Sequence, residues 1–180
     1  MKKKWFVALA AMIMCASVFA DAKANALCEA AENNDVVEAK RLIADDADVD
    51  ARVEFGLTAL MHAAIRNATD VAQILLEAGA DVNAKDIDGK TALMRAAQFN
   101  ATDTMLLLIE AGADVNARND DGWTALMFAA LENAAGTARL LIEAKADVNA
   151  EDYDGWTALI HAKWTNATDV AKLLKAAGAR

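Results

Sequence analysis

The sequence predicts an all-α solenoid in which helix–turn–helix units stack side by side and are joined by β-turn loops. Three observations support this fold class: a four-residue block that recurs every 33 residues, an asparagine at one fixed place in each unit, and Asp-Gly turn signals between units. The block reads Thr58-Ala59-Leu60-Met61, Thr91-Ala92-Leu93-Met94, Thr124-Ala125-Leu126-Met127 and Thr157-Ala158-Leu159-Ile160. A period of this length is typical of units that cannot bury an apolar face alone and must stack on their neighbours. Because such stacks present elongated surfaces, we expect the chain to bind a partner.

The first half of a unit is clearest in residues 86–118. Asp88-Gly89 is a tight-turn signal, and Thr91 then precedes a short apolar helix expected over 92–99. That helix is expected to end at Asn100, because a helix that ends in a left-handed residue favours glycine or asparagine there. The same asparagine recurs in all five units, as Asn34, Asn67, Asn100, Asn133 and Asn166.

The second half of the same unit predicts another helix. Thr102-Asp103 is expected to cap it, and apolar residues follow over 105–109. Gly112 is expected to close the helix, as Gly79 does one unit earlier. An extended loop, residues 113–117, then leads to the next turn.

These motifs resemble the ankyrin repeat, whose pattern runs Gly-x-Thr-Pro-Leu-His-x-Ala-Ala and then Leu-Leu-x-x-Gly-Ala-Asp-x-Asn. Residues 89–97 read Gly-Lys-Thr-Ala-Leu-Met-Arg-Ala-Ala, and residues 108–116 read Leu-Ile-Glu-Ala-Gly-Ala-Asp-Val-Asn. The resemblance covers about residues 25–180, with alanine in place of the family's proline and methionine or isoleucine in place of its histidine. It implies a concave binding surface formed by the turn tips and the exposed face of the first helices.

The period divides the chain into six segments. We expect a signal peptide over 1–20, an N-terminal capping repeat over 21–52, and a C-terminal capping repeat over 152–180. The full repeats between them are expected at 53–85, 86–118 and 119–151. The repeat 119–151 is expected to be the least stable of the three. Gly136 falls at the opening of its second helix, and Lys145 stands where other repeats have a helix-closing glycine.

The first 20 residues predict export. Three lysines precede an apolar run that ends at Ala20, so we expect cleavage before Asp21 and a periplasmic or secreted protein without membrane insertion after cleavage. Cys28 would then be the lone cysteine. We expect it to be a buried small hydrophobe, the alternative being a reactive thiol or an intermolecular bridge.

The charge of the chain restricts its partners. The net charge is −9, and removal of Lys2, Lys3 and Lys4 with the signal peptide would leave 15 basic against 27 acidic residues, or about −12. Nucleic acid is excluded as a partner, because neutralisation of phosphates supplies most of that affinity. Anionic membranes would repel the chain. A protein partner with a basic or apolar patch is favoured.

The aromatic residues of residues 21–180 avoid the positions that the repeat pattern assigns to the packed framework. Four fall in turn tips and three on the side of the first helices that we expect to be exposed: Phe55, Trp123, Tyr153 and Trp156, and then Phe99, Phe128 and Trp164. Such rings dominate binding hot spots. The alternative is that they only cover neighbouring backbone, with Phe128 and Trp164 half-buried.

Apolar and acidic neighbours extend this set. We predict a partner-binding surface that combines an apolar stripe with an acidic rim able to steer a cationic partner. It comprises Phe55, Leu57, Ile65, Phe99, Trp123, Leu131, Tyr153, Trp156, Trp164, Asp121 and Asp154.

Catalysis is not expected. The only serine, Ser17, lies in the signal peptide, and His62 and His161 hold equivalent positions about 25–30 Å apart if stacked helices have their usual spacing. Both histidines are expected at the edge of the stack, and no metal, cofactor or phosphate-loop motif occurs. Binding of small ligands such as glycans or cationic peptides is the second hypothesis, and a self-associating spacer is the third. We expect a monomer.

Overall fold

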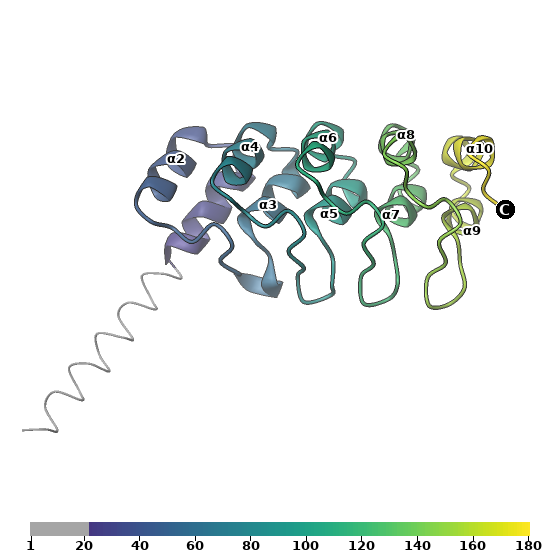
Figure 1. Cartoon of the computed structure of the whole chain (residues 1–180), viewed down its shortest axis with the longest axis horizontal. Coiled ribbons are helices and arrows are strands. Elements are labelled where there is room, and N and C mark those ends of the chain that lie inside the picture. The colour runs from purple at the N-terminus through teal and green to yellow at the C-terminus, as the bar shows by residue number, and fades with distance from the viewer. Residues whose placement is uncertain (1–21) are drawn as a thin grey trace, which may run out of the picture.

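The computed structural model describes residues 22–180 and has the architecture that the sequence predicts (Figure 1). The predicted signal peptide and its cleavage site lie outside these residues. Helical residues 22–32 are followed by α2 (Val36–Ala44) and by the short 3-10 helix η1 (Glu54–Gly56). The helix pairs that follow are α3 (Ala59–Arg66) with α4 (Thr69–Glu77), α5 (Ala92–Gln98) with α6 (Thr102–Glu110), α7 (Ala125–Leu131) with α8 (Ala135–Glu143), and α9 (Ala158–Trp164) with α10 (Thr168–Ala176).

The helices form two layers. In Figure 1, α2, α4, α6, α8 and α10 lie in one row, α3, α5, α7 and α9 lie in a second row, and the turn loops project beyond the second row. Within residues 22–180 the only strand-like pairing is an isolated bridge between Glu151 and Thr157. The prediction of an all-α solenoid is therefore confirmed.

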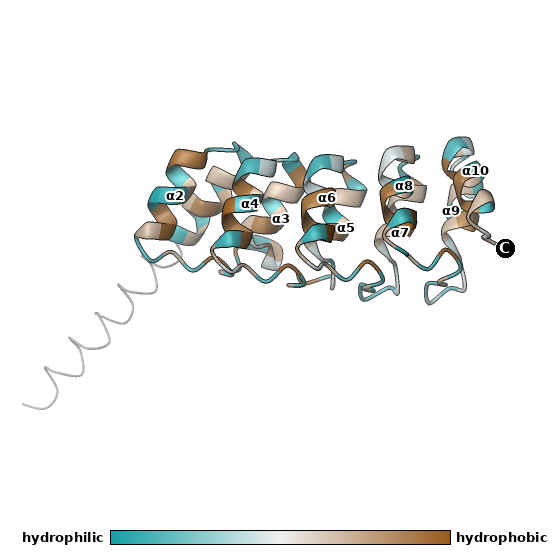
Figure 2. Ribbon diagram, turned by 45° about the horizontal axis from the view of Figure 1, so that its top comes forward, coloured by the Kyte–Doolittle hydropathy of each residue, from teal (hydrophilic) through white to brown (hydrophobic). Residues whose placement is uncertain are grey.

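The core is continuous along the stack because successive first helices pack against one another, α3 on α5, α5 on α7 and α7 on α9. The Leu-Met pair of the repeated block is almost fully buried in three successive units, and small alanines between these side chains let the helices approach closely. The buried pairs are Leu60-Met61, Leu93-Met94 and Leu126-Met127. In Figure 2, apolar and polar segments share each helix, as expected where one face packs and the other meets water.

The recurring asparagine adopts the expected left-handed conformation in every unit. Its φ angle lies between 51° and 58° at Asn34, Asn67, Asn100, Asn133 and Asn166. Lys145 is also left-handed, with φ of 68°, where Gly79 and Gly112 occupy the equivalent place. A side chain with a Cβ is strained in this region, so Lys145 lowers the stability of its repeat.

The expected cap of the second helix is wrong. Residue Ala101 is the N-cap of α6 and offers no side-chain acceptor, while Thr102 and Asp103 already lie inside the helix. The free N–H of Thr104 instead donates to Oδ1 of Asn67, one unit earlier, at 3.0 Å. Nδ2 of Asn67 donates to the Asp103 carboxylate at 3.1 Å. The side chain of one unit thus caps a helix of the next, and we call this pair of hydrogen bonds the asparagine bridge.

The asparagine bridge weakens along the stack. Asn34 forms both bonds, accepting from the Val71 N–H at 3.2 Å and donating to Asp70 at 2.9 Å. Asn100 keeps only an acceptor role, toward the Thr137 hydroxyl at 2.7 Å, because Gly136 stands where a carboxylate is needed. Among the described residues, the Asn133 side chain has no hydrogen bond to α10.

A second ladder joins the loops that follow the second helices. In each case a backbone N–H donates to a side-chain oxygen 31 residues earlier, at 2.8–3.0 Å. The donor and acceptor pairs are Asp81 to Asp50, Asp114 to Asn83, Asp147 to Asn116 and Arg180 to Asn149. Because both ladders run between units, neighbouring units are held in one register.

Restoring the missing carboxylate should stabilise the repeat 119–151. Gly136→Asp places an acceptor near Nδ2 of Asn100 and a negative charge in the first turn of α8. The nearest atom to an added Cβ is the Thr102 methyl group at 3.5 Å, an ordinary contact. We expect the free energy of unfolding to rise by about 1 kcal/mol, measured by urea denaturation.

The control separates the hydrogen bond from the helix-dipole effect. Asn100→Gly keeps the left-handed conformation but removes the amide, so Gly136→Asp should gain clearly less stability in that background. An equal gain in both backgrounds would contradict the role assigned to Asn100.

Candidate functional site

In each of the last three units, one buried side chain at the base of the turn accepts hydrogen bonds from the backbone of the turn tip. Oδ1 of Asp152 accepts hydrogen bonds from the Asp154 N–H at 3.0 Å and from the Trp156 N–H at 2.8 Å. Asn119 accepts from the Trp123 N–H in the same way, at 2.7 Å. These bonds set the backbone positions of Trp123 and Trp156, so the two indoles project from a turn of defined shape.

Five rings form a continuous chain across the last two units. The centroid of the Trp123 ring lies 5.2 Å from Phe128 and 4.3 Å from His161. Trp156 lies 5.3 Å from His161 and 6.3 Å from Trp164, the latter pair nearly edge-to-face at 67°. We call these five residues the aromatic cluster. Contacts of this kind stabilise the rings beyond the burial of their area.

The prediction that His161 is an edge residue is wrong. Its side chain is buried between Trp123 and Trp156, and Nε2 lies 2.9 Å from Oδ2 of Asp152. The physical reason is that the second carboxylate oxygen of Asp152, inside the turn base, needs a partner. Arg95 meets Asp86 in the same manner two units earlier, with Nε 3.0 Å from Oδ2. The shared spacing of nine residues was the signal in the sequence.

Asp152 is held in its ionised form. Burial alone raises its pKa, but the N–H groups of Trp156 and Asp154 and the imidazole of His161 together outweigh burial and lower the pKa below its usual value. The carboxylate is therefore part of the turn framework at neutral pH rather than a titrating group of the surface.

The expectation that no aromatic residue joins the framework is wrong for Phe128. Its side chain is only 5% exposed, and it packs against Trp123, which is itself partly buried against the core. Phe128 occupies the position of His62, Arg95 and His161 in the other units, which faces the turn base. Without a partner carboxylate at Asn119, an apolar ring fills that place.

A cavity of about 230 Å³ opens beside the aromatic cluster. Its walls combine three indoles, one aliphatic side chain, the histidine and two carboxylates: Trp123, Trp156, Trp164, Leu131, His161, Asp152 and Asp154. Trp156 is 37% exposed and Trp164 is 69% exposed. We call this feature the tryptophan cavity. It brings together five residues of the predicted surface, namely Trp123, Leu131, Trp156, Trp164 and Asp154.

The remaining predicted residues lie outside the tryptophan cavity. Tyr153 is 71% exposed on the same turn as Asp154 and Trp156, and the Arg118 guanidinium lies 5.1 Å from its ring centroid. Asp121 is exposed, and its carbonyl accepts from the Tyr153 N–H at 3.1 Å. Phe99 is exposed and Ile65 half-buried, and neither lines this cavity.

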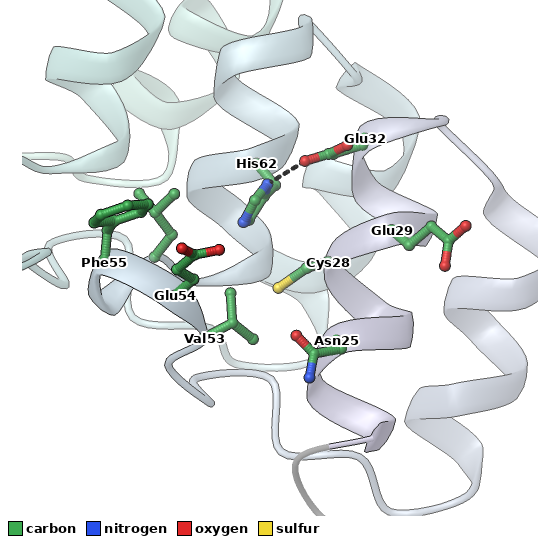
Figure 3. A pocket seen from close by; sticks show the side chains of 9 residues that line it. Asn25, Cys28, Glu29, Glu32, Val53, Glu54, Phe55 and His62 are labelled. Atoms are coloured by element: carbon green, nitrogen blue, oxygen red, sulfur yellow. Dashed lines mark hydrogen bonds and ion pairs between the residues drawn. The ribbon is translucent and has the colours of Figure 1, made fainter.

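Phe55 and Leu57 belong to a separate cavity at the N-terminal end (Figure 3). This cavity of about 360 Å³ also contains Cys28 and His62, and Nδ1 of His62 lies 2.7 Å from the Glu32 carboxylate. Figure 3 shows Glu32 and Glu54 on either side of His62, with Glu29 farther away. The residues of the predicted apolar stripe are therefore not gathered in one place, since Ile65 and Phe99 line neither cavity.

Cys28 is buried, as predicted. Burial, assisted by the negative charge of Glu32, raises the pKa of its thiol to about 12. The thiol is protonated at neutral pH, and this form is a poor nucleophile.

Within residues 22–180, no group of three His, Cys, Asp or Glu side chains is arranged to hold a metal ion. The described helices are also too short or too polar to cross a bilayer.

Two substitutions at Asp152 should separate its two roles. Asp152→Asn keeps the Oδ1 acceptor, as Asn119 does naturally, and should cost about 1–2 kcal/mol through loss of the charged partner of His161. Asp152→Ala also leaves two turn N–H groups unsatisfied and should cost more, about 3 kcal/mol. Both values are measured by urea denaturation at pH 7.

The pH dependence tests the ionic role of Asp152. Because the pKa is lowered in the folded state, the stabilisation is present above the ordinary aspartate pKa of about 4 and is lost as pH falls through the folded-state pKa. The stability difference between the wild type and Asp152→Asn should therefore shrink below about pH 4. A difference that is constant between about pH 3 and 7 would show that ionisation of Asp152 plays no part.

Comparison with known proteins agrees with this architecture. A family model described as ankyrin repeats (3 copies) matches residues 11–86, 27–119 and 93–180. A curated relative, the mitochondrial disaggregase of Bos taurus, is 46% identical over 57 residues, which are 32% of this chain and 8% of that protein. The chain thus corresponds to a small part of that relative's length. The family match spans most of the sequence, and the chain belongs to the ankyrin repeat family.

Proposed function

We propose that this chain is a non-enzymatic, exported interaction module that binds a protein partner through the tips and first helices of its last two units. Ankyrin repeats are in general protein–protein interaction modules. The observation that carries the proposal is the exposure of Trp156 and Trp164 at one cavity, together with exposed Tyr153 on the same turn as Trp156. Exposed aromatic rings beside a cavity are typical of binding hot spots.

The rigidity of the turns supports this proposal. The turn tips are tied to one another by backbone hydrogen bonds, such as Tyr153 N–H to the Asp121 carbonyl at 3.1 Å. Trp156 is also fixed by Asp152 below it. A surface that is already ordered loses little conformational entropy when a partner binds, which favours affinity.

The acidic residues favour a positively charged partner at this surface. Asp121 and Asp154 are exposed beside the aromatic rings, and the whole chain carries a net charge of −9. Such a surface attracts a basic patch over a distance of about 8–10 Å at physiological salt. We therefore propose a partner with a basic patch that also offers apolar contact.

A small ligand is the second candidate for the same surface. The tryptophan cavity, at about 230 Å³, is large enough for a sugar ring or one side chain and too small for a folded element. A glycan or a cationic peptide would contact the same indoles but would not need to contact Tyr153, which lies outside the cavity.

Site-specific cross-linking tests the proposed surface. A photoreactive p-benzoylphenylalanine is placed at Tyr153, or at Leu106, an exposed apolar residue of α6 in the other helix layer. In the native cell, we expect one partner protein to be captured from position 153 and not from position 106. Trp156→Ala or Trp164→Ala in the same chain should reduce that product, since loss of a central anchor typically costs about 2 kcal/mol or more.

Two results would contradict the proposed surface. One is equal capture of the same proteins from both positions, and the other is a product at position 153 that neither alanine substitution reduces. Circular dichroism spectra and denaturation midpoints of the variants show whether their fold is retained.

Export is part of the proposal and rests on the sequence of the first 20 residues. The basic start, the apolar run and Ala20 before Asp21 are typical of a cleaved signal peptide. We expect the intact mass of the protein recovered from the periplasm or medium to correspond to residues 21–180. A recovered mass that retains residues 1–20 would contradict cleavage.

A further inference from the structure

We propose that the tryptophan cavity is a receptor for one cationic side chain, lysine or arginine, that projects from the partner protein. This inference rests on the proposed function and names the chemistry of its central contact. It follows from four observations: the indole walls of the cavity, its size, an unpaired carboxylate at its edge, and cations over aromatic rings elsewhere on the same surface.

The walls of the cavity suit a cation. Trp123, Trp156 and Trp164 all line it, and the rings of Trp156 and Trp164 meet at 67°. Indole is the side chain that attracts cations most strongly, through the negative face of its ring, over distances up to about 6 Å. Rings inclined to one another can contact an ammonium or guanidinium group from more than one side.

The size of the cavity limits the occupant to one side chain. Its volume is about 230 Å³, whereas two cavities along the loop side of the stack measure about 530 and 660 Å³. Those larger cavities are lined mainly by polar loop residues and contain no indole. The tryptophan cavity is therefore distinct in its chemistry as well as in its size.

Asp154 supplies the negative charge. The other carboxylate of the cavity, Asp152, is buried and already bonded to His161, so it has little capacity left for a ligand. Asp154 is exposed and, within residues 22–180, forms no ion pair with a lysine or arginine. Lys163 adjoins Trp164 along the chain but does not line the cavity. A cation in the cavity would thus meet one available carboxylate.

Two aromatic rings near this cavity already have a cation from the chain itself over them, Phe128 in α7 and Tyr153 in the turn of Trp156. Nζ of Lys90 lies 5.6 Å from the centroid of Phe128, and the guanidinium of Arg118 lies 5.1 Å from that of Tyr153. In each pair the cation comes from a unit that precedes the unit of the ring in the chain. No cation of the described chain lies over Trp156 or Trp164, so a partner's side chain can occupy the position that the chain itself fills elsewhere.

Matched peptides test the proposal. The ¹⁵N-labelled full chain is titrated with acetyl-Gly-Gly-Arg-Gly-Gly-amide and with the same peptide containing citrulline, the neutral isostere of arginine. A second pair contains lysine or its neutral derivative acetyl-lysine. The indole N–H signals, assigned with Trp123→Phe, Trp156→Phe and Trp164→Phe, report binding at the cavity. We expect saturable shifts with the cationic peptides and at least about fivefold weaker binding of the neutral ones.

Three variants locate the effect. Asp154→Asn should weaken binding of the cationic peptides several-fold, while Asp88→Asn, at the same turn position two units earlier, should leave it unchanged. Trp164→Ala should remove most of the binding, and its ring is exposed enough that the fold is expected to be retained. Equal binding of charged and neutral peptides would overturn the proposal, as would the absence of indole shifts.

The peptide titration and the cross-linking experiment distinguish failure of the cation receptor from failure of the proposed function. A partner cross-linked at Tyr153, together with no preference for the charged peptides, would support the interaction surface and overturn the cation receptor. Charge-selective peptide binding without any cross-linked protein would support the receptor chemistry and overturn the protein partner in favour of a small cationic ligand.

Discussion

The stack depends on the asparagine that ends each first helix. Its left-handed conformation turns the chain toward the second helix, and in Asn34 and Asn67 its amide also caps the second helix of the next unit. Since α6 has no cap of its own, its first turn is satisfied only when the preceding unit is in place. One residue thus serves both the local fold and the contact between units, which is why a single unit is not an independent structure.

The turn bases connect this framework to the surface. Asp86, Asn119 and Asp152 hold successive turns by the same backbone bonds. The second carboxylate oxygen, Oδ2, determines which side chain of the first helix packs on the turn base. Arg95 contacts Oδ2 of Asp86, and His161 contacts Oδ2 of Asp152. Above Asn119 an apolar ring takes this place. The aromatic cluster is therefore a consequence of how the last two units satisfy one recurrent position, and the exposed indoles are built on a buried, hydrogen-bonded base.

The sequence predicted the repeat fold and its left-handed columns because both are local or periodic properties. It did not predict the asparagine bridge, since Thr102-Asp103 resembled a local cap and the real acceptor lies a full unit earlier in the chain. The placement of Trp156, Trp164 and Asp154 was predictable from free positions of the repeat. The burial of Phe128 and His161 was not, because it depends on which side chain the turn base offers to the first helix.

The place of the tryptophan cavity in the stack has a thermodynamic consequence. Its walls come from both sides of one junction, with Trp123 and Leu131 in one unit and Trp156 and Trp164 in the next. At this junction the Asn133 side chain makes no hydrogen bond to α10, and the unit before it also contains the strained Lys145. A ligand that contacts both walls binds best when the two units are in register, so its binding energy also stabilises their contact. Recognition and stability are therefore linked at a junction that lacks the asparagine bridge.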